Sequence, residues 1–188
     1  MNKGALRKEL IRKRQCVADR TRKDCAIVGN VLSLSEYREA STVLCYLSLR
    51  DEVQTEALIR AAWNDGKSVA VPCCTDDTSM VFYLIEDFDS LLTGTFGVRE
   101  PDPSVHKKLT DFYGSLCIVP GLAFTKTGCR IGYGKGYYDK FLQNYAFHSV
   151  GLCYNSLILE ELPIELHDIS MDIVVTDKYI FGGNYGRI

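Results

Sequence analysis

The sequence predicts an α/β fold, a three-layer α/β/α sandwich with a mostly parallel sheet and a helical N-terminal extension. Residues 42–48 form a continuous apolar run of strand length, which is typical of a parallel strand buried on both faces. Helical periodicity follows over residues 55–64, and a second strand-like run over residues 68–71. A strand, a helix and a strand within about 30 residues predict a βαβ unit with parallel strands.

Length and charge set the broad class of protein. With 188 residues and neither a repeat nor a linker, the chain is predicted to form a single domain over residues 1–188. Its net charge of −2 gives no general case for a nucleic-acid partner. No apolar run approaches the roughly 20 residues that span a bilayer, and no apolar signal segment begins the chain. We expect a cytoplasmic monomer, with neither nucleic acid nor membrane as a partner.

The cysteines and histidines do not indicate a disulfide framework or a zinc centre. None of the eight cysteines forms a C-x-x-C pair, and Cys45, Cys117 and Cys153 stand inside strand-like runs. A free cysteine in such a run behaves as a small hydrophobe. The three histidines are scattered along the chain, which argues against zinc. We expect reduced thiols.

The first segment is strongly basic, with apolar residues at helical spacing. Lys3 and Arg7 are four residues apart and share one helix face. Three interpretations remain open: a solvated basic face, a mitochondrial presequence, and a helix whose first turns reach a phosphate. Glu9 and Asp19 weaken the second, because such presequences are poor in acidic residues.

The remaining elements follow from periodicity and from turn residues. A second helix is expected over residues 19–32, with Asp19 as its N-cap, and a short helical turn over residues 33–40. The helix over residues 55–64 ends at Asp65 and Gly66. Pro72 is expected to close the strand that begins at residue 68. Further segments are strands over 80–85, 116–119, 149–154 and 173–176, a loop over 91–103, and helices over 137–145 and 157–162.

A glycine-rich stretch between an apolar run and a helical pattern is the strongest candidate site. Glycines recur at every second position, and positively charged residues are interleaved: Arg130, Gly132, Gly134, Lys135 and Gly136. Such a backbone can turn successive N–H groups toward an anion, ahead of a helix N-terminus. The alternative is a plain glycine-rich turn. The two cations and Asp139 favour phosphate with a divalent metal.

The spacing of these glycines excludes two common motifs. A P-loop requires a glycine five positions before Gly-Lys, and a Ser or Thr after the lysine; neither is present. A dinucleotide fingerprint is G-x-G-x-x-G, whereas this chain has G-x-G-x-G. Glu52 is a second candidate, because it lies just past the carboxyl end of a predicted strand, although a solvated loop carboxylate is the alternative.

Residues along nearly the whole chain resemble one family. The residues 120–124 read PGLAF and 128–139 read GCRIGYGKGYYD; the similarity also takes in Lys3-x-x-Leu6-Arg7, residues 46–55 and residues 163–176. In this order they resemble the 5-formyltetrahydrofolate cyclo-ligases, also called methenyltetrahydrofolate synthetases. The resemblance implies ATP-dependent cyclisation of 5-formyltetrahydrofolate to 5,10-methenyltetrahydrofolate, with ATP as co-substrate and Mg²⁺ as cofactor.

The resemblance also implies roles for individual residues. ATP contacts are implied for Lys3, Arg7, Arg130, Gly132, Gly134, Lys135, Gly136, Tyr137 and Tyr138. Folate contacts are implied for Leu47, Glu52, Tyr133, Gly134, Lys135, Gly136 and Tyr137. Direct catalytic roles are assigned to Arg130, Lys135 and Tyr137, and magnesium to Asp139 and Asp168.

One position departs from the family pattern. Many members carry arginine where this chain has Tyr133, so a phosphate contact there would involve a hydroxyl and a ring instead of a charge. Two other functions stay open at this stage. The first is a non-catalytic folate- or nucleotide-binding module on the same fold. The second is RNA binding by the basic N-terminal helix, which predicts strongly salt-dependent affinity.

Overall fold

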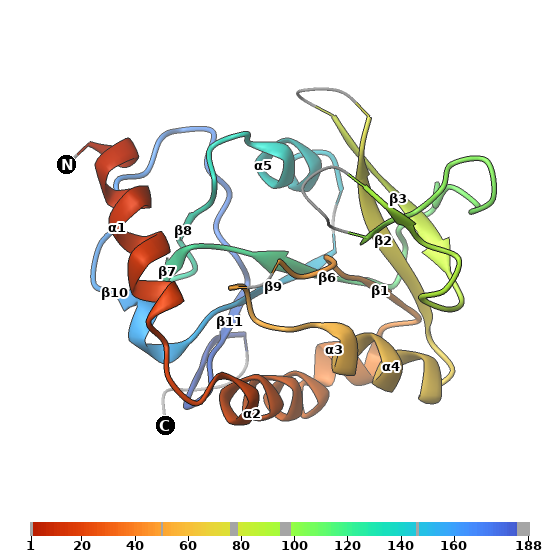
Figure 1. The fold of residues 1–188 in the computed structure, drawn as a ribbon, viewed down its shortest axis with the longest axis horizontal. Helices are drawn as coiled ribbons and strands as arrows, with labels where there is room; N and C mark the ends of the chain where they lie inside the picture. Colours follow the sequence, from red (N-terminus) through yellow and green to blue (C-terminus); the bar gives the residue numbers. More distant parts are fainter. Residues whose placement is uncertain (1, 50, 76–78, 95–98, 146, 184–188) are drawn as a thin grey trace.

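A seven-stranded sheet forms the centre of the molecule, in the order β12-β11-β9-β6-β1-β2-β3 (Figure 1). The computed structural model describes residues 2–49, 51–75, 79–94, 99–145 and 147–183. β1 lies parallel to β2 and β6, and β9 lies parallel to β6 and β11, whereas β3 and β12 pair antiparallel at the two edges. The predicted mostly parallel sheet is confirmed. Its strands are β1 (Thr42–Leu44), β2 (Ser68–Cys74), β3 (Met80–Ile85), β6 (Ser115–Pro120), β9 (His148–Leu152), β11 (Ile173–Val175) and β12 (Ile180–Gly182).

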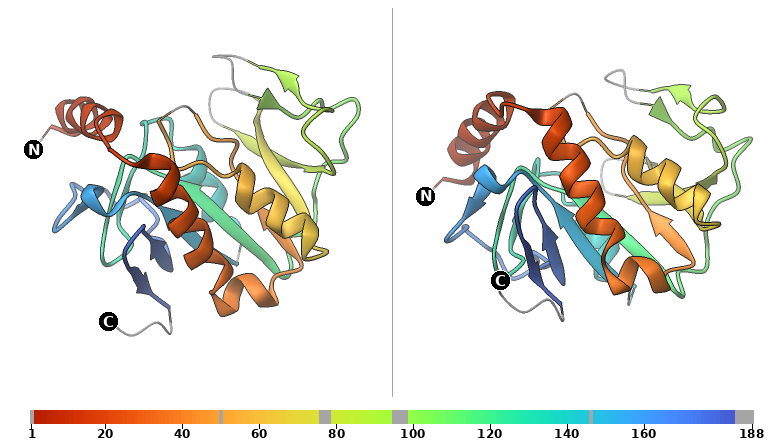
Figure 2. Two further views of the ribbon diagram at one scale, coloured as in Figure 1. Left: turned by 60° about the horizontal axis from the view of Figure 1, so that its bottom comes forward. Right: turned by 90° about the horizontal axis from the view of Figure 1, so that it is seen from below.

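Helices cover both faces of this sheet. Figures 1 and 2 show α2, α3 and α4 along one face, α5 on the opposite face, and α1 projecting beside one end of the sheet. The layer formed by α5 is thin, since this helix has six residues. The helices are α1 (Lys3–Gln15), α2 (Arg20–Leu32), α3 (Ser35–Glu39), α4 (Glu56–Asn64) and α5 (Tyr137–Leu142).

The core follows from the apolar runs in the sequence. β6 lies between β1 and β9, and its residues 116–119 are at most 1% exposed. Burying one such aliphatic side chain contributes about 1.5–3 kcal/mol. In α4, Leu58, Ile59 and Ala62 are fully buried at helical spacing. The βαβ interpretation of this region is therefore confirmed by β1, α4 and the parallel β2.

The N-terminal helix α1 packs against the rest of the protein through a narrow stripe of buried side chains. Its buried side chains are Leu6, Leu10 and Arg14, each four residues after the previous one. Residues at this spacing lie above one another on one helix face. The side chain of Asn2 caps the helix by accepting a hydrogen bond of 2.8 Å from the N–H of Gly4. Two leucines bury little apolar area, so polar contacts matter for the position of α1.

A small second sheet, which we did not expect from the sequence, carries the glycine-rich stretch. It has the order β10-β7-β8, with β7 (Ala123–Thr125), β8 (Arg130–Ile131) and β10 (Ile158–Leu159). Gly128 closes the β7–β8 turn with a φ of 91°, and a Cβ there would lie 2.1 Å from the carbonyl oxygen of Met171. Only glycine fits this position. The hairpin delivers residues 132–136 directly to the start of α5.

Three predicted elements have the wrong length or type. The strand over 42–48 ends at Leu44; beyond it only the N–H of Cys45 still pairs, with Ala70, at 2.9 Å. Pro72 lies inside β2 rather than after it. Since β1 pairs with β2 only up to Ala70, one side of β2 has no neighbouring strand at Pro72, and a missing N–H is tolerated there.

The predicted helix over 157–162 is wrong. A short 3-10 turn, η2 (Asn155–Leu157), and the strand β10 occupy its place, because Ile158 and Leu159 pair in parallel with β7. Such pairing outweighs a weak helix preference.

Three other predictions hold only in part. The helix over 137–145 ends at Leu142, and Tyr145 packs instead on Phe112. The short strands β4 (Leu92–Thr93) and β5 (Arg99–Glu100) lie in the predicted loop over 91–103. Asp19 precedes α2 as predicted, but with a left-handed φ of 54° and without a capping side-chain hydrogen bond.

Candidate active site

A cavity of about 560 Å³ lies where the start of α1, the glycine loop and the segment before β11 meet. Pro120, the last residue of β6, is part of its wall, which places it at the carboxyl end of a parallel strand. Its volume is typical of a small-molecule site. It is lined by Asn2, Lys3, Gly4, Arg7, Pro120, residues 130–139, Glu165, His167 and Asp168.

The glycine loop has a conformation that other residues would strain. Gly134 and Gly136 have φ angles of 103° and 72°. At Gly132 a Cβ would lie 2.7 Å from Nη1 of Arg130, and at Gly134 it would lie 3.1 Å from the guanidinium carbon of Arg7. Because glycine has no side chain, other groups can approach the backbone of this loop closely. Arg7 takes advantage of this, because its Nε donates to the carbonyl of Gly132 at 3.0 Å.

Lys3 connects α1 to the far end of the sequence. Its ammonium group lies 2.9 Å from Oδ2 of Asp168 and 3.2 Å from Oε1 of Glu165. Although burial opposes the shift, these two partners raise the pKa of Lys3. Burial also opposes the shift at Asp168, where the bonds from Lys3 and from the N–H of Glu165 lower the pKa. Lys3 and Arg7, in the first turns of α1, therefore line the cavity. Their contact with a phosphate, the third interpretation of the basic segment, stays a prediction.

Arg130 and Asp139 form a largely buried ion pair in the wall. Nη2 of Arg130 lies 2.8 Å from Oδ2 of Asp139, with side chains 7% and 15% exposed. Oδ1 of Asp139 accepts from the N–H of Ile169 at 3.2 Å. Nε of Arg130 and the hydroxyl of Tyr138 are buried and find no partner within the described residues. Such groups cost about 1–3 kcal/mol each, so a bound ligand is one way to satisfy them.

The carboxylates fit a magnesium ion that arrives with phosphates. Asp139 and Asp168 line the same cavity, but each is already paired with a cation of the protein. The described part of the chain contains no group of three or more His, Cys, Asp or Glu that could hold a metal. Mg²⁺ commonly uses one or two carboxylates together with substrate phosphates and water. The donor set suits that arrangement and not a cage built from protein alone.

Glu52 lies beside a second, much smaller cavity of about 10 Å³, which shares Pro120 with the wall of the first. This cavity is lined by Arg14, Glu52, Tyr154 and several apolar residues. Glu52 is only 5% exposed, so the interpretation as a solvated loop carboxylate is wrong. Burial raises the pKa of its carboxyl group, although the N–H of Leu49 donates to Oε2 at 2.9 Å.

Sequence reasoning missed Arg14, which is 2% exposed and links the two cavities. Its guanidinium group contacts Asp51, Glu52 and the hydroxyl of Tyr133. The sequence does contain a signal for it. Arg14 continues the buried spacing of Leu6 and Leu10, and a charged residue on an apolar stripe is rarely buried without a partner.

The remaining predicted site residues do not all line a cavity. Lys135 is exposed at the rim of the larger cavity, and Tyr137 lines it half-buried. Leu47 is half-buried against the core and is absent from the linings of both cavities as the described residues define them. The role of Leu47 therefore stays a prediction.

Fold and cavity together define a class of protein. It is an α/β protein in which a glycine-rich loop and two cations from an N-terminal helix line a cavity at the carboxyl end of a parallel strand. In addition, no helix in the described ranges has the length and apolar character needed to cross a membrane.

Comparison with known proteins assigns the family within this class. The model of the 5-formyltetrahydrofolate cyclo-ligase family matches residues 1–177, and the chain belongs to this family. It is 34% identical over 171 residues to the 5-formyltetrahydrofolate cyclo-ligase of Saccharomyces cerevisiae, covering 77% of this chain and 80% of the relative. A probable 5-formyltetrahydrofolate cyclo-ligase of Schizosaccharomyces pombe is 32% identical, with 82% and 84% covered.

A solved structure shows the same fold. The NMR structure of Aquifex aeolicus 5,10-methenyltetrahydrofolate synthetase superimposes with a TM-score of 0.83 and 29% sequence identity. The match covers 100% of this chain and 96% of that one. The resemblance inferred from the sequence is thereby confirmed.

Proposed function

We propose that this chain catalyses the ATP-dependent cyclisation of 5-formyltetrahydrofolate to 5,10-methenyltetrahydrofolate, with release of ADP and phosphate. One observation carries the proposal: a bare glycine loop, cations of α1 and two carboxylates distant in sequence meet in one cavity. The names of the relatives supply the substrate. Basic-helix RNA binding is disfavoured, because Lys3 and Arg7 line this cavity and Arg14 is buried.

The chemistry requires activation of the formyl oxygen. This oxygen attacks the γ-phosphorus of ATP, so that an O–P bond forms while the bond to ADP breaks. The product is a phosphorylated, iminium-like intermediate. The 10-nitrogen of the folate then attacks the formyl carbon and gives up its proton to the solvent, the ring closes, and the former formyl oxygen leaves in phosphate. Phosphoryl transfer of this kind depends on positioning and charge neutralisation rather than on a protein nucleophile.

The residues of the larger cavity suit those two tasks. We assign Lys3, Arg7, Arg130 and Lys135 to the phosphates, where Lys3 and Arg7 exchange an internal partner for a phosphate oxygen. Backbone N–H groups at Gly132, Gly134 and Gly136 supply further donors. Tyr137 and Tyr138 border the same space. Lys135, Arg130 and Tyr137 are the groups that we place closest to the transferred phosphoryl group.

Asp139 and Asp168 are the residues that would hold Mg²⁺ together with the phosphates. When bound, the ion supplies positive charge that neutralises the transferring phosphoryl group. The two carboxylates also orient Arg130 and Lys3, with which they are paired in the structure.

We assign the folate to the residues around Glu52; the smaller cavity has a volume of only about 10 Å³, so a pterin ring enters there only if its walls move apart. Glu52 offers a buried carboxylate, which suits the N–H donors of a reduced pterin ring. Tyr133 borders the larger cavity and contacts Arg14 of the smaller one, so it stands where the two substrates meet. Leu47 and the loop from Gly134 to Tyr137 complete this assignment.

We further infer a cytoplasmic monomer whose single cyclo-ligase domain spans residues 1–188. All eight cysteines are unpaired, which is typical of a reducing compartment. The small-molecule partners are a reduced folate and ATP.

An absorbance assay tests the function. Purified protein is mixed with 5-formyltetrahydrofolate, ATP and magnesium, and the methenyl chromophore is followed over time. The proposal predicts that the chromophore appears only with ATP present. If calorimetry instead detects binding of both ligands without ADP release, the chain is a non-catalytic binding module.

A further inference from the structure

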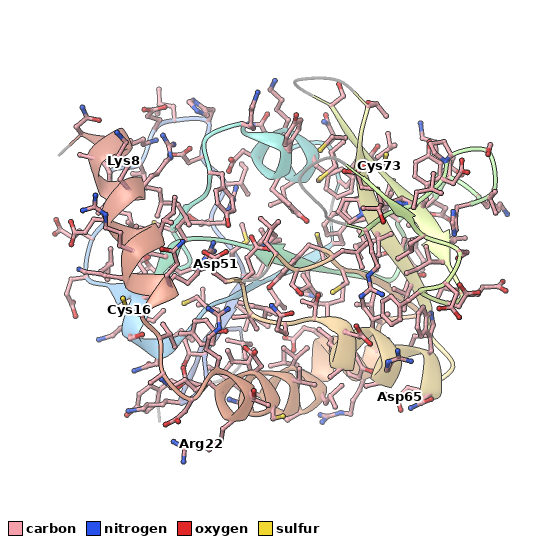
Figure 3. The ribbon with its side chains drawn as sticks, viewed as in Figure 1. Lys8, Cys16, Arg22, Asp51, Asp65 and Cys73 are labelled. Atoms are coloured by element: carbon pink, nitrogen blue, oxygen red, sulfur yellow. The ribbon has the colours of Figure 1, made fainter. Side chains whose placement is uncertain are left out.

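Arg14 is a buried cation for which the proposed mechanism has no role. It points from α1 into the protein and is 2% exposed. Nε and Nη2 lie 3.0 and 2.7 Å from the same oxygen of Asp51, and Nη1 donates to the carbonyl of Gly121 at 3.3 Å. Asp51 lies beside α1 (Figure 3). Desolvating an arginine costs several kcal/mol, so a buried arginine requires several partners.

Arg14 also touches both sides of the candidate site. Its Nη1 lies 3.9 Å from Oε1 of Glu52, in the smaller cavity. Its Nη2 donates to the hydroxyl of Tyr133, and its guanidinium carbon lies 5.4 Å from the centre of that ring. Tyr133 belongs to the glycine loop and lines the larger cavity. One guanidinium group thus contacts the folate-side carboxylate and the nucleotide loop at the same time.

The charges around Glu52 explain why a cation is needed there. The Glu52 carboxylate is faced by Arg14 from α1, by Asp51 from its own loop, and by the hydroxyls of Tyr46, Tyr133 and Tyr138. Arg20 and Tyr154 donate to its backbone carbonyl, at 3.0 and 3.4 Å, and not to its carboxylate. Burial, the largest influence, favours the protonated acid, as Asp51 does more weakly. The N–H of Leu49, then Arg14 and then the hydroxyl of Tyr133 favour the carboxylate.

We infer that Arg14 is a positioning residue, which keeps Glu52 as an oriented carboxylate and ties it through Tyr133 to the glycine loop. This inference rests on the proposed function, since it assumes that Glu52 contacts the folate. It also gives a structural role to Tyr133, the position that departs from the family pattern. Here the cation is supplied by α1, and the loop supplies the hydroxyl that accepts from it.

The test is the affinity of Arg14→Met for 5-formyltetrahydrofolate, measured by calorimetry without ATP and by KM in the chromophore assay. Removing one partner of a buried charge pair is expected to weaken folate binding about tenfold to a hundredfold. Arg12→Met is the matched control, because Arg12 lies on the same helix and is exposed. The control is expected to stay within twofold of wild type.

A pH series separates positioning from mere structural support. Without Arg14, Glu52 binds its proton more readily, so folate affinity is lost at a higher pH than in wild type. Arg14→Lys keeps the charge but not the planar fork, and is expected to restore the pH profile with only part of the affinity. A residue with a purely structural role would leave this profile unmoved.

Tyr133→Phe keeps the inference testable if Arg14→Met fails to fold. It removes one hydroxyl and leaves the Arg14–Asp51 pair, so we expect roughly a threefold to tenfold loss in folate affinity and no loss of fold. Suppose that the wild-type protein is active, and that Arg14→Lys and Tyr133→Phe both keep the folate affinity and the pH profile of wild type. This result would overturn the inference about Arg14 but not the proposed function. Wild-type protein that neither binds nor converts the folate would overturn the proposed function, and the inference with it.

Discussion

At the scale of single residues, the glycine loop combines a constrained backbone with an exposed cation. Lys135 is exposed at the cavity rim, so its removal is not expected to disturb the core. Gly134 and Gly136 hold positive φ angles that place the loop beneath Arg7 and before α5. The chemistry and the backbone can therefore be tested separately.

Lys135→Ala is expected to lower kcat about a hundredfold to a thousandfold, because one charge that stabilises the transferring phosphoryl group is lost. The unfolding midpoint in urea is expected to stay unchanged. Lys140→Ala is the matched control, since Lys140 is exposed on α5 and lies outside the cavity lining. Wild-type turnover in Lys135→Ala would show that this loop does not bind the transferred phosphate.

Gly134→Ala tests the backbone. The φ of 103° and the close approach of Arg7 predict a loss of about 1–3 kcal/mol in the free energy of unfolding, together with lower activity. Gly29→Ala, in α2, is the contrasting variant, because no atom lies within 4 Å of its added Cβ. It is expected to gain about 0.5–1 kcal/mol. Equal unfolding midpoints for the two variants would contradict the strained-loop interpretation.

At the scale of elements, helix α1 is held against the rest of the protein mainly by side chains of the candidate site. It buries two leucines, and its other anchors are Lys3, Arg7 and Arg14. Asp168, the partner of Lys3, is separated from it by 165 positions in the sequence. The proposed binding of phosphates and the docking of α1 therefore depend on the same side chains.

Lys3→Met is expected to raise KM for ATP about tenfold and to speed hydrogen exchange of the α1 amides. Lys8→Met, on the exposed face of α1, is the control and is expected to change neither quantity. Slower exchange, or an unchanged KM for ATP, would show that Lys3 does not anchor this helix at the nucleotide site.

The Lys3–Asp168 ion pair also determines the pH range over which it stabilises the docking of α1. The pKa of Asp168 is lowered, so its contribution to stability is present above its ordinary pKa and is lost as pH falls through the lowered value. The pKa of Lys3 is raised, so its contribution is present below its ordinary pKa and is lost as pH rises through the raised value. Docking of α1 is therefore expected to be insensitive to pH near neutrality.

Elements differ in how well the sequence predicts them. Long periodic segments such as α2, α4 and β3 were placed within a residue or two of their ends, because local pattern and burial agree there. The β7–β8–β10 sheet was missed, since its two- and three-residue strands have no periodicity and depend on pairing between residues 124 and 158. The glycine loop is predicted from the spacing of its glycines and from the charged residues between and after them. Arg14 is not, because its partners come from loops distant in the sequence.

At the scale of the whole molecule, the sheet places the end of β6 and the loop after β1 next to each other, because β1 and β6 pair in parallel. The glycine loop and Glu52 are thus brought together by topology, and Arg14 of α1 contacts both. A sequence pattern can propose each part, but only the strand order determines that they are neighbours.

Ligand binding is expected to stabilise the whole chain. With ATP and magnesium at about a hundred times the dissociation constant, the gain is about 2.7 kcal/mol, or roughly 5–10 °C in Tm for a chain of this length. A chelator of magnesium is expected to remove much of this gain, and Asp139→Asn is expected to reduce it. A Tm that ATP raises equally with and without magnesium would contradict the assignment of the two carboxylates.

The central claim is that the formyl oxygen is phosphorylated by ATP in this cavity. The most direct measurement uses 5-formyltetrahydrofolate labelled with ¹⁸O in the formyl group, with mass analysis of the phosphate released during methenyl formation. The account predicts one ¹⁸O in each phosphate, with one ADP for each methenyltetrahydrofolate. Unlabelled phosphate, or a methenyl product formed without ADP, would contradict it.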